Sequence, residues 1–325
     1  MLSQIKKTLN RSFLYQYLAT EYKKMTVKIN PLIEINRCYS ASFNGKKINM
    51  DNPKNLIEKI YWMELYADTS LWSKCTDKYR MREYVQECGL EEYLPKNLGV
   101  WYNAEDISFD ALPNEFILKT NNGCGDNYVV TNKIAWGGVQ IDKIKKVFKH
   151  AMRLQRQGYS NAQLHYLNIK PCVIAEELLH QSEEEKQFSP SSLVDYKVWC
   201  INGKVEAVLV VFERKSHNDY KLSMFDSDWN NISAKTLKPE KHCYSGLDIP
   251  KPKCLDNMIQ IAQQLAKPFV EVRVDFYNID DKPILGELTF STGYGYYTDE
   301  YYEYLGQKID LSKVKKSDIP NYKKI

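Results

Sequence analysis

The chain has 325 residues, of which 43% are hydrophobic and 26% charged, the composition of an ordinary globular protein. This length allows two or three packed units that share cores. We take the net charge of +4 as spread along the chain, so composition indicates no nucleic-acid-binding surface and leaves acidic small molecules as reasonable ligands. No apolar run approaches the ~20 residues that a transmembrane helix needs.

The N-terminus and the cysteines indicate a cytoplasmic protein. Residues 1–24 contain no apolar core and no small-residue cleavage site, so we expect no signal peptide. Their positive charge would allow contact with an anionic membrane, and a solvated amphipathic helix explains the same pattern. The eight cysteines show no Cys-x-x-Cys pair and no metal-binding spacing, so we expect reduced thiols. Histidine is scarce, and no Ser or Cys lies in a nucleophile elbow, which disfavours triad hydrolysis.

The first 75 residues are predicted to be mainly helical. Asn52-Pro53 is a helix start signal, and apolar residues then follow at near-helical spacing from Leu56 to Leu65. This segment is too short for a complete nucleotide-binding α/β domain. We therefore expect an N-terminal cap or a substrate-recruiting element.

A second helix is predicted from Asp77, a plausible N-cap, to the residue before Gly89, a plausible C-terminal stop. Lys78 falls in its first turn, where the helix dipole disfavours a cation. This position makes Lys78 a candidate phosphate ligand, with an exposed surface lysine as the alternative.

A glycine-containing loop is predicted between two antiparallel strands, 115–119 and 128–131, after an earlier strand at 95–101. No helix follows this loop, so it is neither a P-loop nor a dinucleotide-binding turn. Gly123 and Gly125 can bring backbone N–H groups close to phosphates, and Lys119 adds a positive charge. A plain hairpin turn is the alternative.

The middle of the chain is predicted to hold a basic-faced helix at 142–157 and a buried strand at 172–175 that ends in acidic residues. A strand of this kind has the form of an adenine-binding linker. The acid-rich stretch at 180–192 is expected to be an exposed loop. A hairpin follows, with strands at 195–201 and 204–212, an Asn-Gly turn between them and Arg214 at its end.

Residues 271–290 form the hairpin on which the functional prediction depends. Apolar and polar residues alternate along both halves, so one face is buried and the other carries Arg273, Asp275, Glu287 and Thr289. Pairing Tyr277 with Pro283 places Arg273 opposite Glu287 and Asp275 diagonal to it, about 7–8 Å away. Such oxygen ligands suit Mg²⁺. An ordinary hairpin with one Arg–Glu pair is the alternative. A helix at 252–267, with Leu255, Met258, Ile259, Ala262, Leu265 and Ala266 as its buried stripe, is predicted to pack on this sheet.

The order of these features resembles the ATP-grasp superfamily, and most closely the TupA-like ATP-grasp family, which is associated with polysaccharide and teichuronopeptide assembly. The resemblance extends from about residue 45 to 306. It rests on the segments NPKNLIEKIYW, DKYRMREYV, FILK with its glycine loop, AEELL, DYK, RVDFY and GELTF. It implies an α+β fold in which two subdomains with antiparallel sheets, 76–178 and 179–325, grip ATP and follow the helical segment 1–75.

The resemblance also implies an ATP-dependent carboxylate–amine ligase that uses ATP and Mg²⁺ and forms an amide through an acyl phosphate. The carboxylate would belong to a small molecule or a glycan, such as a uronic acid or an amino acid. Thr289 stands where many ATP-grasp enzymes carry Asn, and it can still offer an oxygen. The positions implied are Lys78, Lys119 and Lys197 for the ATP phosphates, Asn122, Gly123 and Gly125 in the glycine loop, Glu176, Glu177 and Leu178 around adenine, Asp195 for the ribose, Arg214 and Arg273 for the acyl phosphate, and Asp275, Glu287 and Thr289 for Mg²⁺.

Three other functions compete with this interpretation. Asp226 and Asp228 form the DxD pattern that some glycosyltransferases use, although both fit a turn better. An ATP-grasp kinase would use the same nucleotide site on a hydroxyl group. A non-catalytic nucleotide sensor is disfavoured because both metal carboxylates are present.

Overall fold

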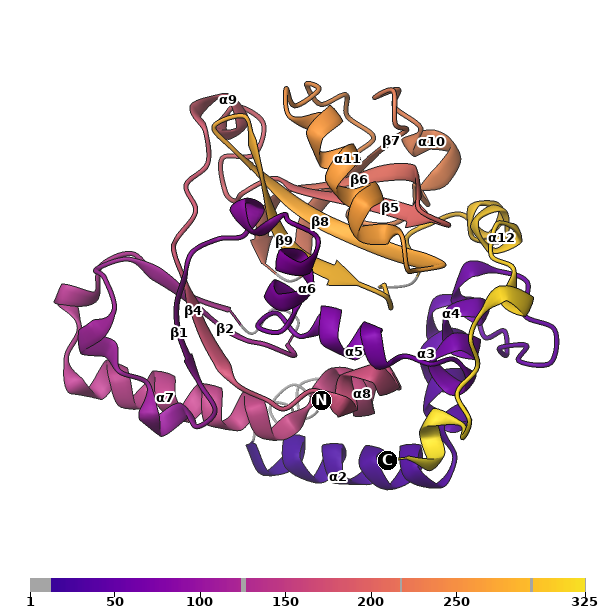
Figure 1. Ribbon diagram of the computed structural model, residues 1–325, viewed down its shortest axis with the longest axis horizontal. Coiled ribbons are helices and arrows are strands. Elements are labelled where there is room, and N and C mark those ends of the chain that lie inside the picture. Colours follow the sequence, from indigo (N-terminus) through magenta and orange to yellow (C-terminus); the bar gives the residue numbers. More distant parts are fainter. Residues whose placement is uncertain (1–12, 124–126, 217, 293–294, 325) are drawn as a thin grey trace, which may run out of the picture.

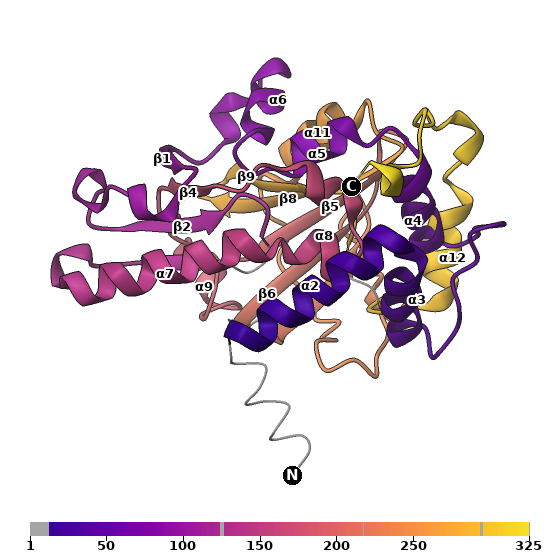
Figure 2. The same cartoon turned by 90° about the horizontal axis from the view of Figure 1, so that it is seen from below.

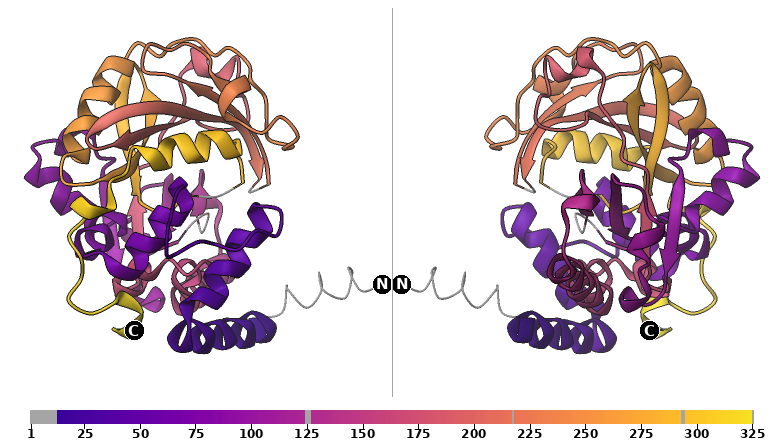
Figure 3. Two further views of the ribbon diagram at one scale, coloured as in Figure 1. Left: turned by 90° about the vertical axis from the view of Figure 1, so that its right-hand side faces the viewer. Right: turned by 90° about the vertical axis from the view of Figure 1, so that its left-hand side faces the viewer.

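The computed structural model describes residues 13–123, 127–216, 218–292 and 295–324 (Figure 1). Two antiparallel sheets and an N-terminal group of helices make up the fold, which confirms the predicted α+β class. The side views place the five-stranded sheet at one end of the molecule and the first described helix at the other (Figure 3). Within the described residues, no helix has the length and apolarity to span a membrane.

The smaller sheet has the strand order β1-β4-β2-β3 and carries the predicted glycine loop between β2 and β3. One face is covered by α7 (Gly138–Leu154), which begins four residues before the predicted start. Ile144 and Phe148 of α7 join Phe116 and Leu118 of the sheet in a small apolar core. The strands are β1 (Asn97–Trp101), β2 (Phe116–Thr120), β3 (Asn127–Val130) and β4 (Val173–Glu176).

The larger sheet has the strand order β7-β6-β5-β8-β9. The Asn202-Gly203 and Asp280-Asp281 turns both have two residues in the left-handed region, the geometry that two-residue hairpins favour. The strand β6 extends past the predicted Phe212, through a bulge, so that Arg214 lies inside it. The strands are β5 (Asp195–Ile201), β6 (Lys204–Ser216), β7 (Asp219–Phe225), β8 (Glu271–Ile279) and β9 (Lys282–Thr289).

One face of this sheet is covered by α11 (Leu255–Ala266), as predicted. Ile261 is buried in α11, whereas Ile259, which we placed in the buried stripe, is only half-buried. The acid-rich stretch is not wholly exposed, which corrects the prediction. Ser182 caps the short helix α9 (Glu183–Lys186), and the helical turn directs Glu185 inward, where it accepts hydrogen bonds from Tyr196 and Asn278.

The N-terminal segment is helical, as predicted, and packs against the end of the chain. The helix α4 begins at Leu56, three residues after the predicted signal, because Asn55 and Glu58 form a capping box. It lies against α12 (Asp299–Gln307), where Gly306 approaches Lys54 so closely that a Cβ would lie 2.1 Å from its carbonyl oxygen. The helices are α2 (Phe13–Ile29), α3 (Pro31–Ser42), α4 (Leu56–Tyr66), α5 (Ser70–Thr76), α6 (Met81–Glu87), α8 (Arg156–Ser160) and α10 (Ser233–Thr236).

The described apolar residues form two core clusters. The larger cluster surrounds the five-stranded sheet and includes the N-terminal helices, and the smaller one lies between the four-stranded sheet and α7. The short helix α6 contributes Met81, Tyr84 and Val85 to the larger cluster, although the next strand, β1, belongs to the smaller sheet. The subdomain boundaries at 75 and 178 stay predictions.

Candidate active site

The hairpin β8–β9 places Asp275 directly opposite Glu287 and Arg273 opposite Thr289. The predicted register was therefore wrong. The turn pairs Asn278 with Pro283, so the strands are shifted by one residue from the predicted pairing. A bulge in β9, opposite residues 275 and 276 of β8, shifts the pairing by one more residue. Because two one-residue shifts leave every side chain on its original face, all four polar residues still share one face.

Gly286 is the extra residue of this bulge, since Leu285 and Glu287 pair with adjacent residues of β8. A Cβ at Gly286 would lie 3.1 Å from the Tyr277 ring and 3.4 Å from the carbonyl oxygen of Asp275. The glycine thus allows the two strands to approach closely at the level of the carboxylates.

Arg273 organises the buried part of this face. Its Nε donates a hydrogen bond to Oδ1 of Asp275 and its Nη2 donates one to Oδ2, both at 2.7 Å, so the ion pair is bidentate. Its Nη1 donates to Thr292 at 2.8 Å, and Nη2 also donates to Thr289 at 3.1 Å. Burial alone would lower the pKa of Arg273, but the Asp275 carboxylate outweighs it and raises that pKa. The guanidinium is therefore charged and fixed in orientation.

Lys197 comes from the neighbouring strand β5 and lies opposite Asp275. Its Nζ donates to Asp275 and lies 2.6 Å from Asp195. Burial would lower the pKa of Lys197, but the charges of Asp195 and Asp275 outweigh it and leave that pKa above its ordinary value. Lys197 thus stays a cation between two carboxylates.

Lys78 connects the β8–β9 hairpin to the glycine loop. Its Nζ lies 3.2 Å from Glu287 on β9 and donates at 3.0 Å to the carbonyl oxygen of Gly123 in the glycine loop. Burial would raise the pKa of Glu287, but the charges of Lys78, Lys197 and Arg273 outweigh it and hold that pKa well below its usual range. Glu287 is therefore ionised at neutral pH.

The smaller sheet contributes a second buried ion pair. Lys119 on β2 lies 2.7 Å from Glu176 at the end of β4, and Arg82 lies 3.6 Å from the other oxygen of Glu176. Glu177 faces the opposite way along the edge, where its carboxylate accepts the backbone N–H of Lys96 at 2.7 Å. Glu176 and Lys119 thus line the side of the glycine loop, and Glu177 fixes the edge of β1.

The central charges are balanced. Three carboxylates, Asp195, Asp275 and Glu287, are matched by three cations, Lys78, Lys197 and Arg273. In a balanced set of this kind the cations can exchange their carboxylate partners for an anionic ligand, because each cation is already desolvated and held in place.

The donor set fits Mg²⁺ that is shared with a phosphate ligand. No group of three or more acidic, His or Cys side chains suited to a metal occurs among the described residues. Mg²⁺ commonly takes only one or two carboxylates and completes its shell with water and phosphate. Asp275 and Glu287 supply two carboxylates directly opposite each other. Thr289 is engaged in hydrogen bonds, accepting from Arg273 and lying 3.2 Å from Glu287.

The sequence model of the TupA-like ATP-grasp family matches residues 58–310 of the chain. The chain belongs to the TupA-like ATP-grasp family. This membership confirms the predicted resemblance and the ATP-grasp fold, and the matched range contains every residue of the balanced charge network.

Solved structures of ATP-grasp ligases are also similar to this TupA-like protein. D-alanine–D-alanine ligase from Bacillus anthracis complexed with ATP is 12% identical, with 75% of this chain and 68% of that chain covered and a TM-score of 0.47. The L-amino acid ligase from Bacillus licheniformis is 11% identical, with 69% and 44% covered and a TM-score of 0.42. A search of curated proteins finds no match.

The TupA-like chain gathers most, though not all, of its predicted site residues. Arg214 stacks on the ring of Tyr220 on β7 at 4.7 Å, and Tyr220 donates a hydrogen bond to Tyr296. The cation–π contact of Arg214 is therefore with a tyrosine pair and not with a carboxylate of the charge network. Asn122 is buried in the glycine loop, Leu178 is half-buried beyond β4, and Gly125 lies outside the described residues.

The DxD pattern holds a turn in this structure. Asp226 accepts backbone hydrogen bonds from Asp228 at 3.0 Å and from Asn230 at 2.8 Å. These bonds close the loop after β7, which is the role that the turn interpretation predicts.

A buried cluster behind Arg273 was not predicted. Ser291 donates to Glu64 at 2.6 Å, and Nδ1 of His165 lies 2.6 Å from the same carboxylate oxygen. The carbonyl oxygen of Ser291 accepts from Gln163 at 3.2 Å. Since Thr292 follows Ser291 and accepts from Arg273, the helix α4 helps to fix the Arg273 guanidinium. The Ser-Thr pair after GELTF was visible in the sequence, but Glu64 looked like part of an ordinary packed helix.

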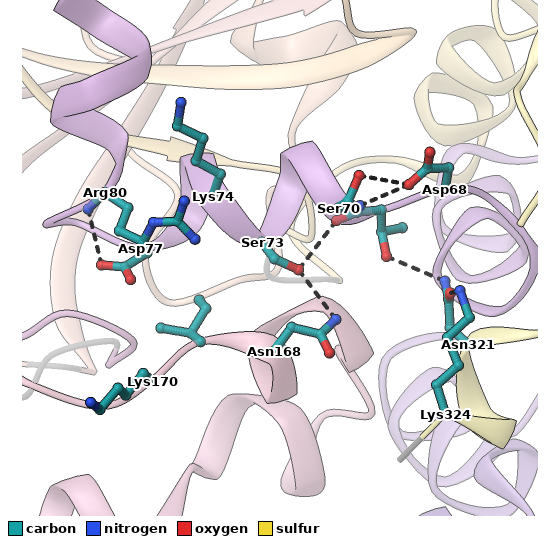
Figure 4. Close-up of a pocket in the computed structure, with 12 residues that line it drawn as sticks. Asp68, Ser70, Ser73, Lys74, Asp77, Arg80, Asn168, Lys170, Asn321 and Lys324 are labelled. Atoms are coloured by element: carbon teal, nitrogen blue, oxygen red, sulfur yellow. Dashed lines mark hydrogen bonds between the residues drawn. The ribbon is translucent and has the colours of Figure 1, made fainter.

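A polar cavity of about 400 Å³ lies beside α5 (Figure 4). Asp77 is part of its wall and accepts the backbone N–H groups of Tyr79 and Arg80, which orders the turn that carries Lys78. Burial raises the pKa of Asp77. Lys74 points away from the cavity toward α6, where it pairs with Glu87. None of the sequence-predicted site residues lines this cavity.

Proposed function

We propose that this chain is an ATP-dependent carboxylate–amine ligase. The observation that carries the proposal is the charge-balanced network on β5, β8 and β9, with Lys78 bridging it to the glycine loop. Phosphoryl transfer needs positioned cations and metal carboxylates more than a protein nucleophile, and this network supplies both. Membership of the TupA-like ATP-grasp family supports the same conclusion.

In the first step, one carboxylate oxygen of the acid attacks the γ-phosphorus of ATP, and the bond to the β–γ bridging oxygen breaks, releasing ADP. Lys78 and Lys197 would exchange their carboxylate partners for phosphate oxygens, and Lys119 would hold the nucleotide beneath the glycine loop. Asp275 and Glu287 would hold Mg²⁺, which neutralises phosphate charge when it is bound.

In the second step, the amine attacks the carbonyl carbon of the acyl phosphate. Phosphate leaves with the former carboxylate oxygen, and the amine nitrogen loses its proton. Arg273 would hold the transferred phosphate, because its bidentate geometry suits phosphate as well as carboxylate. Arg214, at the far end of β6, would contact the acid or the acyl phosphate from the other side.

The adenine would lie along the end of β4, with Glu176, Glu177 and Leu178 at the base and Asp195 at the ribose. The acid would be a uronic acid or an amino acid of a surface polysaccharide, as the family association suggests. We place the reaction in the cytoplasm, where ATP is available. The seven described cysteines are free thiols, which supports a reducing compartment.

Phosphorus NMR of the purified protein with Mg-ATP and a pool of uronates, sugar nucleotides and amino acids tests the proposal. ADP and inorganic phosphate that form only when both an acid and an amine are present would support the ligase. ADP with phosphate retained on a hydroxyl group would instead identify a kinase. Intact ATP with loss of a sugar nucleotide would identify a glycosyltransferase.

A further inference from the structure

The helix α2 carries an apolar stripe on its exposed side. Its members recur at alternating intervals of three and four residues, which keeps them on one face of a helix. Their exposed fractions range from 37% to 73%, so each contacts solvent. At 1.5 Å per residue the stripe is about 21 Å long. Its members are Tyr15, Leu18, Tyr22, Met25 and Ile29.

The other side of α2 holds the helix on the protein. Thr20, Thr26 and Val27 are buried, and the helix packs against α3, α8 and the chain end at Asn321–Lys323. In the view from below, α2 lies at the front of the molecule (Figure 2). The stripe is therefore displayed by a docked helix, so its exposure is a property of the fold.

The sequence segment that ends with this helix is basic, contrary to the even spread of charge that we expected. Residues 1–29 contain six of the 45 Lys and Arg and one of the 41 acidic residues, a net charge of +5. The remaining 39 basic and 40 acidic residues leave the rest of the chain at −1. The stripe thus lies in a basic segment, and α2 itself carries three Lys and one Glu, a net charge of +2.

A second basic helix lies beside α2. The 17 residues of α7 include five Lys or Arg and one Asp, a net charge of +4. Arg153 of α7 stacks on the Tyr17 ring at 4.6 Å, and His150 lies 3.0 Å from Gln16. In the view from below, both helices lie on the side that faces the viewer (Figure 2). This surface therefore combines an apolar stripe with two neighbouring sources of positive charge.

We propose that α2 docks on an anionic membrane surface, with the stripe in the headgroup region and the lysines of α2 and α7 against lipid phosphates. A helix with an apolar face and a basic polar face binds membranes in this way. Tyr15 and Tyr22 suit the interface, because a tyrosine ring is apolar and its hydroxyl stays in water. A second copy of the chain suits the stripe less well, since two copies of α2, each with three Lys and one Glu and so a net charge of +2, would repel each other.

Vesicle co-sedimentation of the full chain tests the proposal independently of enzyme activity. The probes are phosphatidylcholine vesicles with and without phosphatidylglycerol. We expect binding only to the anionic vesicles and a marked loss of binding at high salt, because salt screens the lysines. The double variant Leu18→Ser/Met25→Ser should bind at least about tenfold more weakly.

The matched control is Leu247→Ser, because Leu247 is 53% exposed against 57% for Leu18 and lies in the segment between α10 and α11. It should bind as the wild type does. Thermal unfolding of all three proteins checks that the fold is kept. Equal binding by the double variant and the wild type, or binding without phosphatidylglycerol, would overturn the proposal. A dimer seen by light scattering that the double variant abolishes, without vesicle binding, would assign the stripe to self-association instead.

Discussion

Replacing Glu287 by Gln is the substitution that tests the role of the network most sharply. Gln keeps the size of the side chain and removes its charge. The native carboxylate lies 3.2 Å from Lys78 and 3.6 Å from Arg273, and one third of its side chain is exposed. The variant therefore removes the counter-charge of two cations and one of the two proposed Mg²⁺ ligands, with no change in packing volume.

The expected effects on folding and on activity differ in size. The attraction between Glu287 and Lys78 at 3.2 Å is about 5 kcal/mol at an effective dielectric constant of about 20. Desolvation offsets most of this, so a partly exposed carboxylate should contribute only about 1 kcal/mol to the free energy of unfolding. Loss of a metal carboxylate should instead cost about 4 kcal/mol in the transition state, about a thousandfold in rate.

The assay compares ADP release and urea unfolding for the wild type, Glu287→Gln and a matched control. The control is Glu206→Gln. Glu206 lies on β6 of the same sheet, outside the network, and the substitution breaks its 2.7 Å ion pair with Lys308, which follows α12. We expect the control to keep its activity and both variants to stay folded. A folded Glu287→Gln protein that turns over ATP at the wild-type rate would refute the assignment of β9 to metal binding.

Three further substitutions test other parts of the account. Lys119→Met should weaken ATP binding about tenfold or more, measured by titration calorimetry, because it removes a phosphate cation and keeps the apolar stem. Hydrogen bonds from Lys315 and Ser70 lower the pKa of Asp68 to about 2. Asp68 therefore stabilises the folded state above its unfolded pKa of about 3.9, and this contribution is lost as pH falls toward the folded value. Asp68→Asn should lower the free energy of unfolding by about 1 kcal/mol near neutral pH and by almost nothing at about pH 2, as followed by urea unfolding across pH. The Glu64 carboxylate faces the Ser291 hydroxyl, Nδ1 of His165 and the backbone N–H of His165, the last at 3.2 Å. Glu64→Gln leaves these three groups with one acceptor oxygen and should cost about 2 kcal/mol in urea unfolding; an unchanged unfolding midpoint would contradict this role of Glu64.

The sequence predicted the large sheet well, because the signals there are local. The strand β5 has the predicted bounds, and its Asn-Gly turn adopts the expected left-handed conformation. Period-two alternation on β8 and β9 also identified the correct polar face. Their register was not predictable from alternation, because it depends on the pairing at the turn and on the bulge at Gly286, and alternation specifies neither.

Contacts between distant segments were beyond the reach of pattern analysis. The hydrogen bond between Glu64 and Ser291 joins residues 227 positions apart in the sequence. Glu185 lay in an acid run that is typical of an exposed loop, and only its contacts with Tyr196 and Asn278 explain its burial. In both cases tertiary packing assigns a role that the surrounding residue types do not encode.

Transfer of labelled oxygen tests the acyl-phosphate route most directly. Once an acid substrate is known, it is prepared with ¹⁸O in both carboxylate oxygens and turned over with Mg-ATP and the amine. Phosphorus NMR then resolves labelled from unlabelled inorganic phosphate. The account predicts one ¹⁸O atom in each phosphate released, because the attacking carboxylate oxygen leaves with the phosphoryl group. Amide formation with unlabelled phosphate would contradict it.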